Sequence, residues 1–585
     1  MKSTRAKVAA VTAAALAFVS AAYADNQCVP AFNSQIATGT VVRSEIAHNL
    51  IGHTPRVIKA MNDSGKMADD QVLTVAVALK LNNESELDQR IEEMYRAGSP
   101  SFHQFITPAE FVSKYAPTAA QIAQEKAFLE SKGITVTGMS ANNVFIKASG
   151  TVSALNAAFK TEVHTFRHQN GKQYFAPKFD LSTPVESRIT AVVGLTNTAE
   201  FHNHLRLGAM AAKAPKKQGT APSGGFGPTD IRSAYNIPNN LDGSGQTLAL
   251  FELDGYKAAN ITKYTKQFSL ATPKLTNVLV GGFSGKPSDG EPEVELDIEL
   301  MIALAPKATE IIVYEGANSE EGLIDTYTRI ASDNKAPQIS TSWGLAESNA
   351  SSADEQSENT IFKQMVAQGQ TLFSAAGDSG AKDDGSTVGA DDPSAQPYVV
   401  AVGGTKLVTD GNFNWQSETT WNELSVNEGA GGGGISTVWT IPSWQASAIS
   451  KANTQGSKTM RNTPDVALNA DPETGYGVYI TDPQSRRTLW APIGGTSAAA
   501  PLWAAFNALV NQNRAAKGLS NTGFLNPALY ALGAGKTYNA DFHDIADGSS
   551  NGAGTDGFKT VKGFDNSTGW GSFQGTNLLN DLSSN

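Results

Sequence analysis

The stretch QTLFSAAGDSGA, residues 370–381, joins a short apolar strand to a polar, glycine-rich loop. Four more short apolar strands follow the same pattern: QTLALFEL (246–253), ATEIIVYE (308–315), APQISTSWG (336–344) and YVVAVGG (398–404). Helical segments, including one over residues 354–368, separate several of them. This alternation predicts an α/β fold with a parallel sheet covered by helices on both faces. Sites in such sheets lie at the carboxyl ends of strands, where Asp378 follows the first stretch.

The region before this sheet has a different pattern. Residues 35–205 alternate strand-like and helix-like segments and contain a hairpin that turns at Asn170-Gly171. Thr107, with Glu110 three residues later, has the pattern of a capping box. These features predict a separate α+β domain of the ferredoxin-like type.

The chain divides into four segments. Residues 1–24 combine basic residues, a short apolar run and the small-x-small site Ala22-Tyr23-Ala24, which indicates a secretory signal peptide. The α+β domain is assigned to 25–205. Residues 206–225, RLGAMAAKAPKKQGTAPSGG, lack apolar periodicity and are expected to be an exposed linker open to proteolysis. The α/β domain occupies 226–585.

Composition excludes several classes of partner. A net charge of −11 argues against nucleic acid and against an anionic membrane surface. No segment after the signal is long and apolar enough to span a membrane, so export without an anchor is expected. Cys28 is the one cysteine and cannot form an internal disulfide, so packing or a metal must stabilise the exported fold.

A candidate nucleophile lies in APIGGTSAAAP, residues 491–501, where Ser497 stands near the start of a helix, with Pro501 expected in its first turn or so. An ordinary N-cap serine would look the same, so the decision depends on partners. Histidine is scarce here: of eight histidines, only His543 lies beyond residue 204. A histidine base is therefore difficult to supply.

Carboxylates offer an alternative base. In GEPEVELDIELMIALAP, residues 290–306, Glu293 and Asp297 are four apart and share one face of a helix. Two like charges there repel, so one of the pair is expected to hold a proton. A solvated, acidic helix start explains several of these acids but gives no reason for this pair.

The motif GDSG, residues 377–380, also resembles the nucleophile signature of chymotrypsin-like proteases, which would make Ser379 the nucleophile. Those enzymes are antiparallel barrels with a histidine upstream in their own domain. Because no histidine lies between residues 205 and 542, this interpretation fails.

Taken in order, EVELD, SAAGDSG and GGTSAAAP resemble the sedolisin family, the serine-carboxyl peptidases with a subtilisin-like fold. The resemblance spans nearly the whole mature chain, with the α+β domain similar to the family's pro-kumamolisin-type activation prodomain. It implies that Ser497 is the nucleophile, Glu293 the general base, Asp297 the residue that orients it, and Asp378, when protonated, a donor to the oxyanion.

The resemblance implies further site residues. Ser342, Trp343 and Gly344 match a segment that borders the substrate, and the glycine run 429–436 is expected to form another wall. FHDIADGSS and VKGFDNSTGWG resemble the family's calcium site, a structural ion that suits all-oxygen ligands. On that match the ligands are the Asp544 and Asp565 side chains and the carbonyls of Ile545, Val561 and Gly563, and His543 has a structural role.

The expected protein is therefore a secreted, monomeric, acid-acting endopeptidase made as a self-processing zymogen, with a protein or peptide substrate and its own prodomain as inhibitor. Cleavage in the 206–225 linker would release the enzyme, with acid as the trigger. Three alternatives stay open: an inactive peptide-binding relative, a histidine-based hydrolase, and tripeptidyl-peptidase specificity.

Overall fold

The computed structural model describes residues 47–208, 218–482 and 485–584. The predicted signal peptide and Cys28 lie outside these ranges. No helix among the described residues is long and apolar enough to cross a membrane.

A large, mainly parallel sheet forms the centre of the α/β domain. Its strand order is β13-β14-β12-β15-β17-β19-β20, and β23 pairs with β19 off this path. Of these pairings, only β19 with β20 is antiparallel. The strands are β12 (Thr247–Glu252), β13 (Lys274–Leu279), β14 (Glu310–Glu315), β15 (Gln338–Thr341), β17 (Thr371–Ala375), β19 (Val399–Thr409), β20 (Trp415–Thr420) and β23 (Val466–Asn469). Each of the five predicted strand segments overlaps one of them, and β19 runs five residues beyond the predicted end at residue 404.

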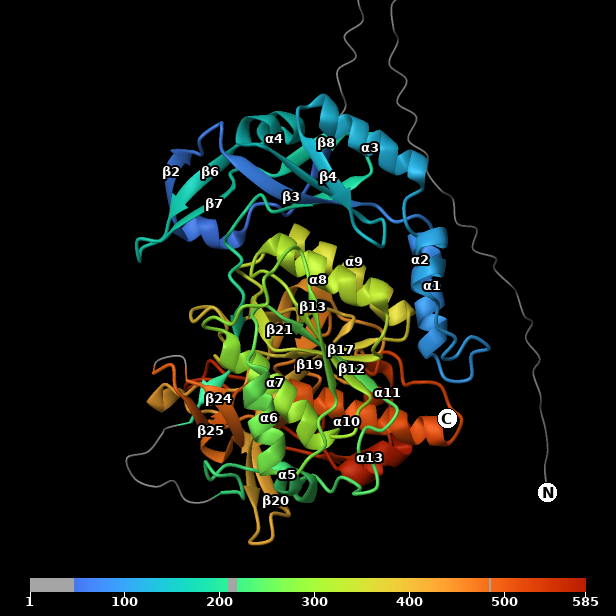
Figure 1. Ribbon diagram of the computed structural model, residues 1–585, viewed down its shortest axis with the longest axis vertical. Coiled ribbons are helices and arrows are strands. Elements are labelled where there is room, and N and C mark those ends of the chain that lie inside the picture. Colours follow the sequence, from blue (N-terminus) through green and yellow to red (C-terminus); the bar gives the residue numbers. More distant parts are fainter. Residues whose placement is uncertain (1–46, 209–217, 483–484, 585) are drawn as a thin grey trace, which may run out of the picture. The chain divides into compact units, whose positions relative to one another are not determined.

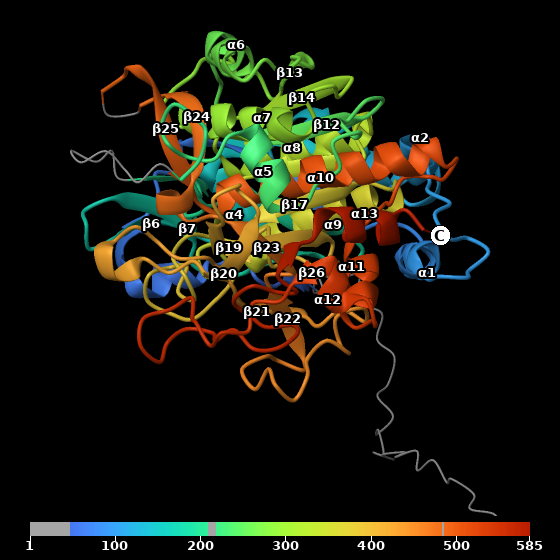
Figure 2. The same cartoon turned by 90° about the horizontal axis from the view of Figure 1, so that it is seen from below.

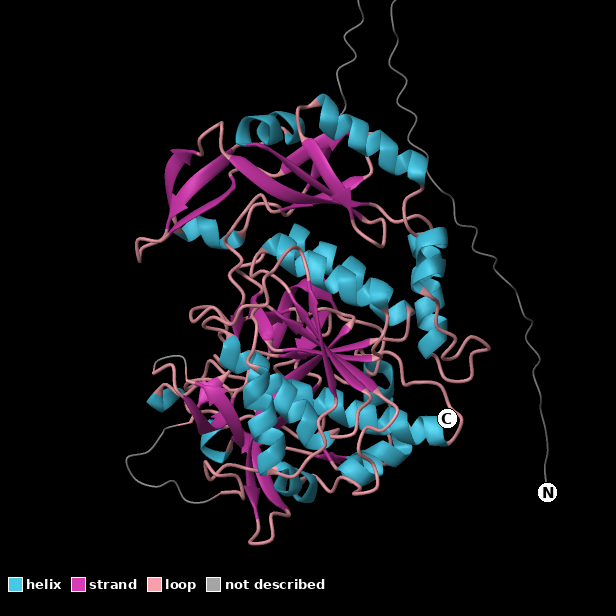
Figure 3. Cartoon of the chain, viewed as in Figure 1, coloured by secondary structure: helices cyan, strands magenta, loops and turns pink. Residues whose placement is uncertain are grey.

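Helices cover both faces of this sheet, as predicted. Helices α7 (Glu291–Leu304) and α10 (Thr496–Ala516) lie on one side, and α8 (Glu320–Asp333) and α9 (Ser352–Ala367) on the other (Figure 1). The strands fan between them with the usual twist (Figure 3). Helix α10 lies alongside α7 (Figure 2), and this contact joins the two helices that carry Ser497 and the Glu293–Asp297 pair.

Pro501 lies deeper in its helix than expected. It is inside α10, in the second turn. Because proline has no N–H, it cannot bond to the carbonyl of Ser497, four residues back. The hydroxyl oxygen of Ser342 lies 3.3 Å from that carbonyl oxygen.

The N-terminal domain has the predicted ferredoxin-like sheet. Its strands are β3 (Val72–Leu79), β4 (Thr135–Met139), β5 (Phe145–Thr151) and β9 (Ile189–Val193), in the antiparallel order β4-β5-β3-β9. Its helices are α1 (Glu84–Tyr95), α2 (Pro108–Lys114), α3 (Ala119–Ser131) and α4 (Val152–Phe159). Thr107 caps α2 by accepting from the Glu110 amide, but the complete capping box lies at Thr118 and Gln121.

The sheet of the N-terminal domain packs on α8 and α9 of the α/β domain. Lys147 pairs with Asp325 at 2.6 Å, and the Gly194 amide donates to Glu320 at 3.2 Å. Lys363 of α9 pairs with Glu84 and Asp88 of α1. These contacts carry the polar part of the interface.

One histidine of the N-terminal domain is buried in its neutral form. His53 is 3 % exposed, its Nδ1 faces the Leu50 carbonyl at 3.1 Å, and its Nε2 accepts from the Val192 amide at 3.0 Å. The ring must therefore be neutral, since a second ring proton would face that amide. Burial lowers the pKa of His53 to about 4, while Leu50 and the carboxylate of Asp180 act to raise it.

We expect His53 to contribute stability that is present above pH 6.5 and lost as pH falls towards 4, because the unfolded chain takes up the proton first. In a Ser497→Ala background, His53→Gln should reduce the loss of unfolding free energy between pH 7 and pH 4 by about 3 kcal/mol. Urea titrations followed by circular dichroism measure this, with the exposed His48→Gln as control. An equal loss in both variants would contradict the prediction.

Candidate active site

Helix α7 carries the predicted acid pair into the protein interior. Glu293 and Asp297 are both fully buried, and the hydroxyl of Ser342 donates to Asp297 Oδ1 at 2.9 Å. Burial raises the pKa of both carboxyls well above the ordinary range, and the repulsion between them raises that of Asp297 further. The predicted face of α7 therefore carries two buried carboxyl groups that both tend to hold a proton.

Ser497 lies beside this pair. It is fully buried at the start of α10, and its hydroxyl acts to lower the pKa of Glu293. The Ser497 hydroxyl and the two Glu293 carboxylate oxygens are buried, and none of them makes a hydrogen bond that meets the distance and angle limits.

One further acid, Glu252, extends the site and was missed in the sequence. Glu252 ends β12 and accepts from the Trp343 indole N–H at 2.8 Å. Burial raises the pKa of Glu252 to about 8, and its charge helps to raise that of Asp297. The available signal was an acid that ends an apolar strand at its carboxyl end. Trp343 joins the buried acids through its indole N–H.

Asp378 lies after β17, as predicted, and faces the start of α10. Its Oδ1 accepts from the amide and hydroxyl of Thr496 at 2.8 and 2.9 Å. Its Oδ2 has no hydrogen bond of full geometry, although Arg206 Nε lies 3.4 Å away. Burial raises the pKa of Asp378, whereas Arg206, His204 and Thr496 lower it.

The chain's own segment 202–207 crosses this site. Strand β10 (His202–Asn203) pairs antiparallel with β16 (Trp343–Ala346), and β11 (Arg206–Leu207) pairs with β25 (Thr488–Gly494). Between them, the His204 amide donates to Ser342 O, and the Ser497 amide donates to His204 O, each at 3.2 Å. Residues 206–208 are thus bound rather than a free linker, and 209–217 lie outside the described residues.

The predicted walls of the cleft differ in character. Gly344 pairs with His202 through the backbone. The glycine run 429–436 packs closely: a side chain at Gly432 would collide with the Ala376 carbonyl. Gly429 also lines a cavity of about 380 Å³ with Arg206, Asp378 and Ser379. This run is therefore a close-packed wall, not a loose loop.

The predicted calcium ligands lie on one C-terminal loop. Asp544 Oδ1 accepts from the Tyr538 hydroxyl at 2.8 Å and from the Gly563 amide at 3.2 Å. Asp565 accepts from the Val561 amide at 2.9 Å. Burial and the charges of Asp544 and Asp565 raise the pKa of the Tyr538 hydroxyl. Two carboxylates with the carbonyls of Ile545, Val561 and Gly563 nearby in sequence are a donor set that fits Ca²⁺. His543 instead stacks on Trp415, with ring centroids 4.1 Å apart.

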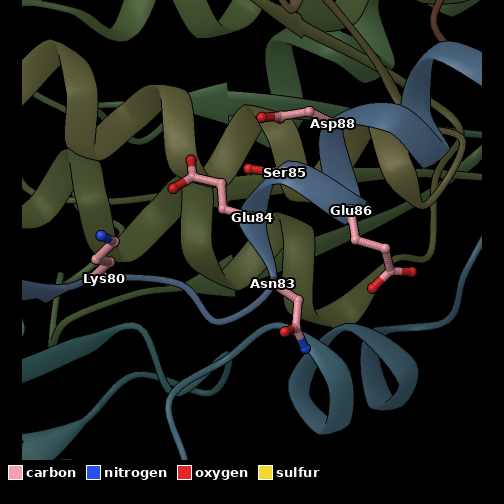
Figure 4. A pocket seen from close by; sticks show the side chains of 6 residues that line it. All are labelled: Lys80, Asn83, Glu84, Ser85, Glu86 and Asp88. Carbon is pink, nitrogen blue, oxygen red and sulfur yellow. The ribbon is translucent and has the colours of Figure 1, made fainter. Parts of the chain in front are cut away.

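An acidic cluster and a surface pocket elsewhere in the protein do not form candidate active or metal sites. Glu423, Asp471 and Glu473 converge, but Lys406 Nζ already pairs with all three within 3.0 Å. A pocket of about 760 Å³ lies on the N-terminal domain (Figure 4) and contains neither a partnered nucleophile nor an apolar wall. Its lining residues are Lys80, Asn83, Glu84, Ser85, Glu86 and Asp88.

Comparison with known proteins is consistent with this arrangement. Residues 59–198 match the family model described as pro-kumamolisin, activation domain, and residues 298–571 match the subtilase family. The chain is 35% identical to kumamolisin of Bacillus sp. (strain MN-32), over 91% of this chain and 96% of the relative. It is 30% identical to sedolisin of Pseudomonas sp. (strain 101), over 91% of each.

A solved structure supports the same conclusion. The chain aligns with Pseudomonas sedolisin, a serine-carboxyl proteinase complexed with pseudo-iodotyrostatin, with a TM-score of 0.56 and 28% identity. The match covers 63% of this chain and all of that one. Tripeptidyl-peptidase 1 of Rattus norvegicus is a more distant relative, 26% identical over 88% of this chain and 93% of its own length.

Proposed function

Because the chain belongs to the sedolisin family of serine-carboxyl peptidases, we propose that it is an acid-acting endopeptidase that processes its own precursor. Ser497 is the nucleophile, Glu293 its general base, Asp297 the group that orients Glu293, and Asp378 the donor to the oxyanion. The observation that carries this proposal is that Ser497 and Glu293 are both fully buried on helices α10 and α7, which pack against each other, and that Ser497 acts to lower the pKa of Glu293. In the described part of the chain, no histidine ring hydrogen-bonds to Ser497.

Asp378 sets the first requirement on pH. A carboxylic acid donates a hydrogen bond only when it is protonated, and burial raises the pKa of Asp378 towards that condition. As pH falls, the protonated fraction of Asp378 rises, so its Oδ2 can donate to the negative oxygen that develops on the substrate carbonyl. The Ser497 amide at the start of α10 is the second donor to that oxygen.

Glu293 sets the opposite requirement. It must be unprotonated to accept the Ser497 proton, and burial, Glu252 and Asp378 all raise its pKa. The hydrogen bond from Ser342 to Asp297 favours the charged form of that neighbour and holds it in place. Activity therefore needs one carboxyl charged and another protonated, which gives a bell-shaped pH profile.

The proposal is tested by incubating the purified precursor between pH 2 and pH 8 and following precursor loss and casein hydrolysis. We expect both only in the acid range. Activity confined to neutral pH would refute carboxylate-base catalysis. Mass spectrometry of a long peptide digest separates internal cleavage from serial release of tripeptides, the activity named in the rat relative.

We also propose that the protein is exported through its predicted signal peptide and holds one calcium ion. When bound, Ca²⁺ would neutralise Asp544 and Asp565 and fix their loop against Tyr538. In Ser497→Ala precursor, added calcium at 100 times its Kd should stabilise the fold by about 2.7 kcal/mol and raise its Tm. EDTA should reverse this, and Asp565→Asn should remove the response. A Tm that does not change when calcium is added would refute the proposed calcium site.

A further inference from the structure

The N-terminal domain contacts the α/β domain at a second place, apart from the interface between its sheet and α8 and α9. The contact is made by residues 95–106, here called the clamp segment, which run from the end of α1 towards α2. The Tyr95 hydroxyl donates to Val366 O at 2.6 Å. The Ile106 amide donates to Ala367 O at 3.0 Å. Both acceptors belong to the last turn of α9, and the last carbonyls of a helix lack partners within it, so the clamp segment supplies donors to that helix end.

Aromatic rings fill the space between the end of α9 and the loop that follows α10. A side chain added at Gly369 or at Gly523 would lie 2.4 or 2.5 Å from the ring of Phe105, so this ring packs closely on both glycines. The Tyr95 ring meets the Phe524 ring edge-on, with centroids 6.0 Å apart. The clamp segment is therefore closely packed on the α/β domain.

His103 lies within this contact and faces a cation. Arg514 belongs to the last turn of α10, and its Nη2 lies 3.2 Å from His103 Nδ1. A guanidinium can only donate, so Nδ1 must accept and the ring must be neutral. Arg514 is held in place, since its Nε donates to Ser520 O and its Nη1 to Leu582 O, each at 2.7 Å. A second proton on the ring would therefore place two N–H groups and two positive charges against each other.

The other neighbours of the His103 ring carry no charge that offsets an added proton. Phe102 stacks on the ring with centroids 3.8 Å apart, and the rings of Tyr95 and Phe105 lie at 6.2 and 5.6 Å. Burial and the Arg514 charge lower the pKa of His103 to about 4, and no carboxylate among the described residues acts to raise it. The ordinary pKa of the ring is 6.5, so its contribution to docking is present above that pH and is lost as pH falls towards 4.

We propose that His103 is an acid-sensitive latch: its protonation against Arg514 releases the clamp segment, so that the N-terminal domain stays docked near neutral pH and separates from the processed enzyme in acid. This rests on the proposed self-processing activity and adds a regulatory residue outside the active site. Ser497 stands at the start of α10 and Arg514 in its last turn, so the latch lies about 25 Å from the nucleophile. Its response to pH is therefore separable from that of catalysis.

The first test follows the Ile106 amide, which is hydrogen-bonded to the α/β domain only while the clamp segment is docked. Ser497→Ala precursor is labelled in deuterium between pH 4 and pH 7, and exchange in peptides that contain Ile106 is corrected for the intrinsic rate at each pH. We expect opening to rise by about 10- to 100-fold from pH 7 to pH 4. In His103→Gln, whose amide can accept from Arg514 without gaining a charge, the rise should be at least about 10-fold smaller.

The exposed His48→Gln is the matched control for this exchange experiment and should show the same rise as the parent. An equal rise in His103→Gln, or a rise that is also lost in His48→Gln, overturns the latch.

His103→Lys supplies the opposite case, a permanent charge against Arg514. In the same Ser497→Ala background, opening at the Ile106 amide at pH 7 should exceed that of the parent by about 10-fold or more. Circular dichroism at pH 7 checks that the rest of the fold is kept. A clamp segment that is as protected in His103→Lys as in the parent overturns the latch.

The consequence for activation is measured on chains that keep Ser497. The pH at which half of the precursor becomes active in a fixed time should fall by about 1 unit in His103→Gln, because the clamp segment is then released without the His103 proton. The purified processed enzymes should share one pH–rate profile. An unchanged activation midpoint overturns the latch, whereas precursor that gains no activity at any pH rejects the proposed function. Exchange at Ile106 needs no catalysis, so it distinguishes the two failures.

Discussion

Ser497→Ala precursor should remain full length at every pH, with peptide hydrolysis lower by at least about 10⁴-fold. The Ser497 hydroxyl at the start of α10 acts on Glu293, and alanine leaves the fold of the helix intact. Gel analysis of the precursor and a fluorogenic peptide assay measure the two effects.

The neighbouring Ser379 is the control for this variant, since it belongs to the alternative GDSG interpretation. Ser379→Ala should still process itself in acid. If Ser379→Ala were inert and Ser497→Ala active, the nucleophile assignment would be wrong.

Glu293→Gln should lower kcat by at least about 10³-fold across the pH range, because an amide cannot take the Ser497 proton. Its size and burial are kept, so KM should change much less. Measuring kcat and KM separately between pH 2 and pH 7 distinguishes loss of the base from loss of substrate binding.

Glu295→Gln is the matched control on the same helix. Glu295 faces away from Ser497 and accepts from Asn260 at 2.7 Å and from the Thr481 amide at 3.0 Å. We expect its kcat to stay within a few-fold of the natural enzyme. A Glu293→Gln variant that kept its activity would sink the carboxylate-base mechanism.

Local sequence patterns predicted most of the fold. The five apolar strands and the hairpin at Asn170-Gly171 depend on neighbouring residues, so their periodicity was readable. The depth of Pro501 in α10 and the capping box at Thr118 were missed, because helix ends depend on contacts that spacing alone does not record. The export signal, the domain limits and the roles of the site residues stay predictions.

The sequence by itself determined that the α/β domain has almost no histidine to serve Ser497, and that Glu293 and Asp297 share a helix face. Only the tertiary structure decided which distant groups join them: Glu252 from β12, Trp343 from β16, and the carbonyl of His204. These positions are set by which strands lie side by side. Such proximity arises from packing over long sequence separations, and local spacing does not record it.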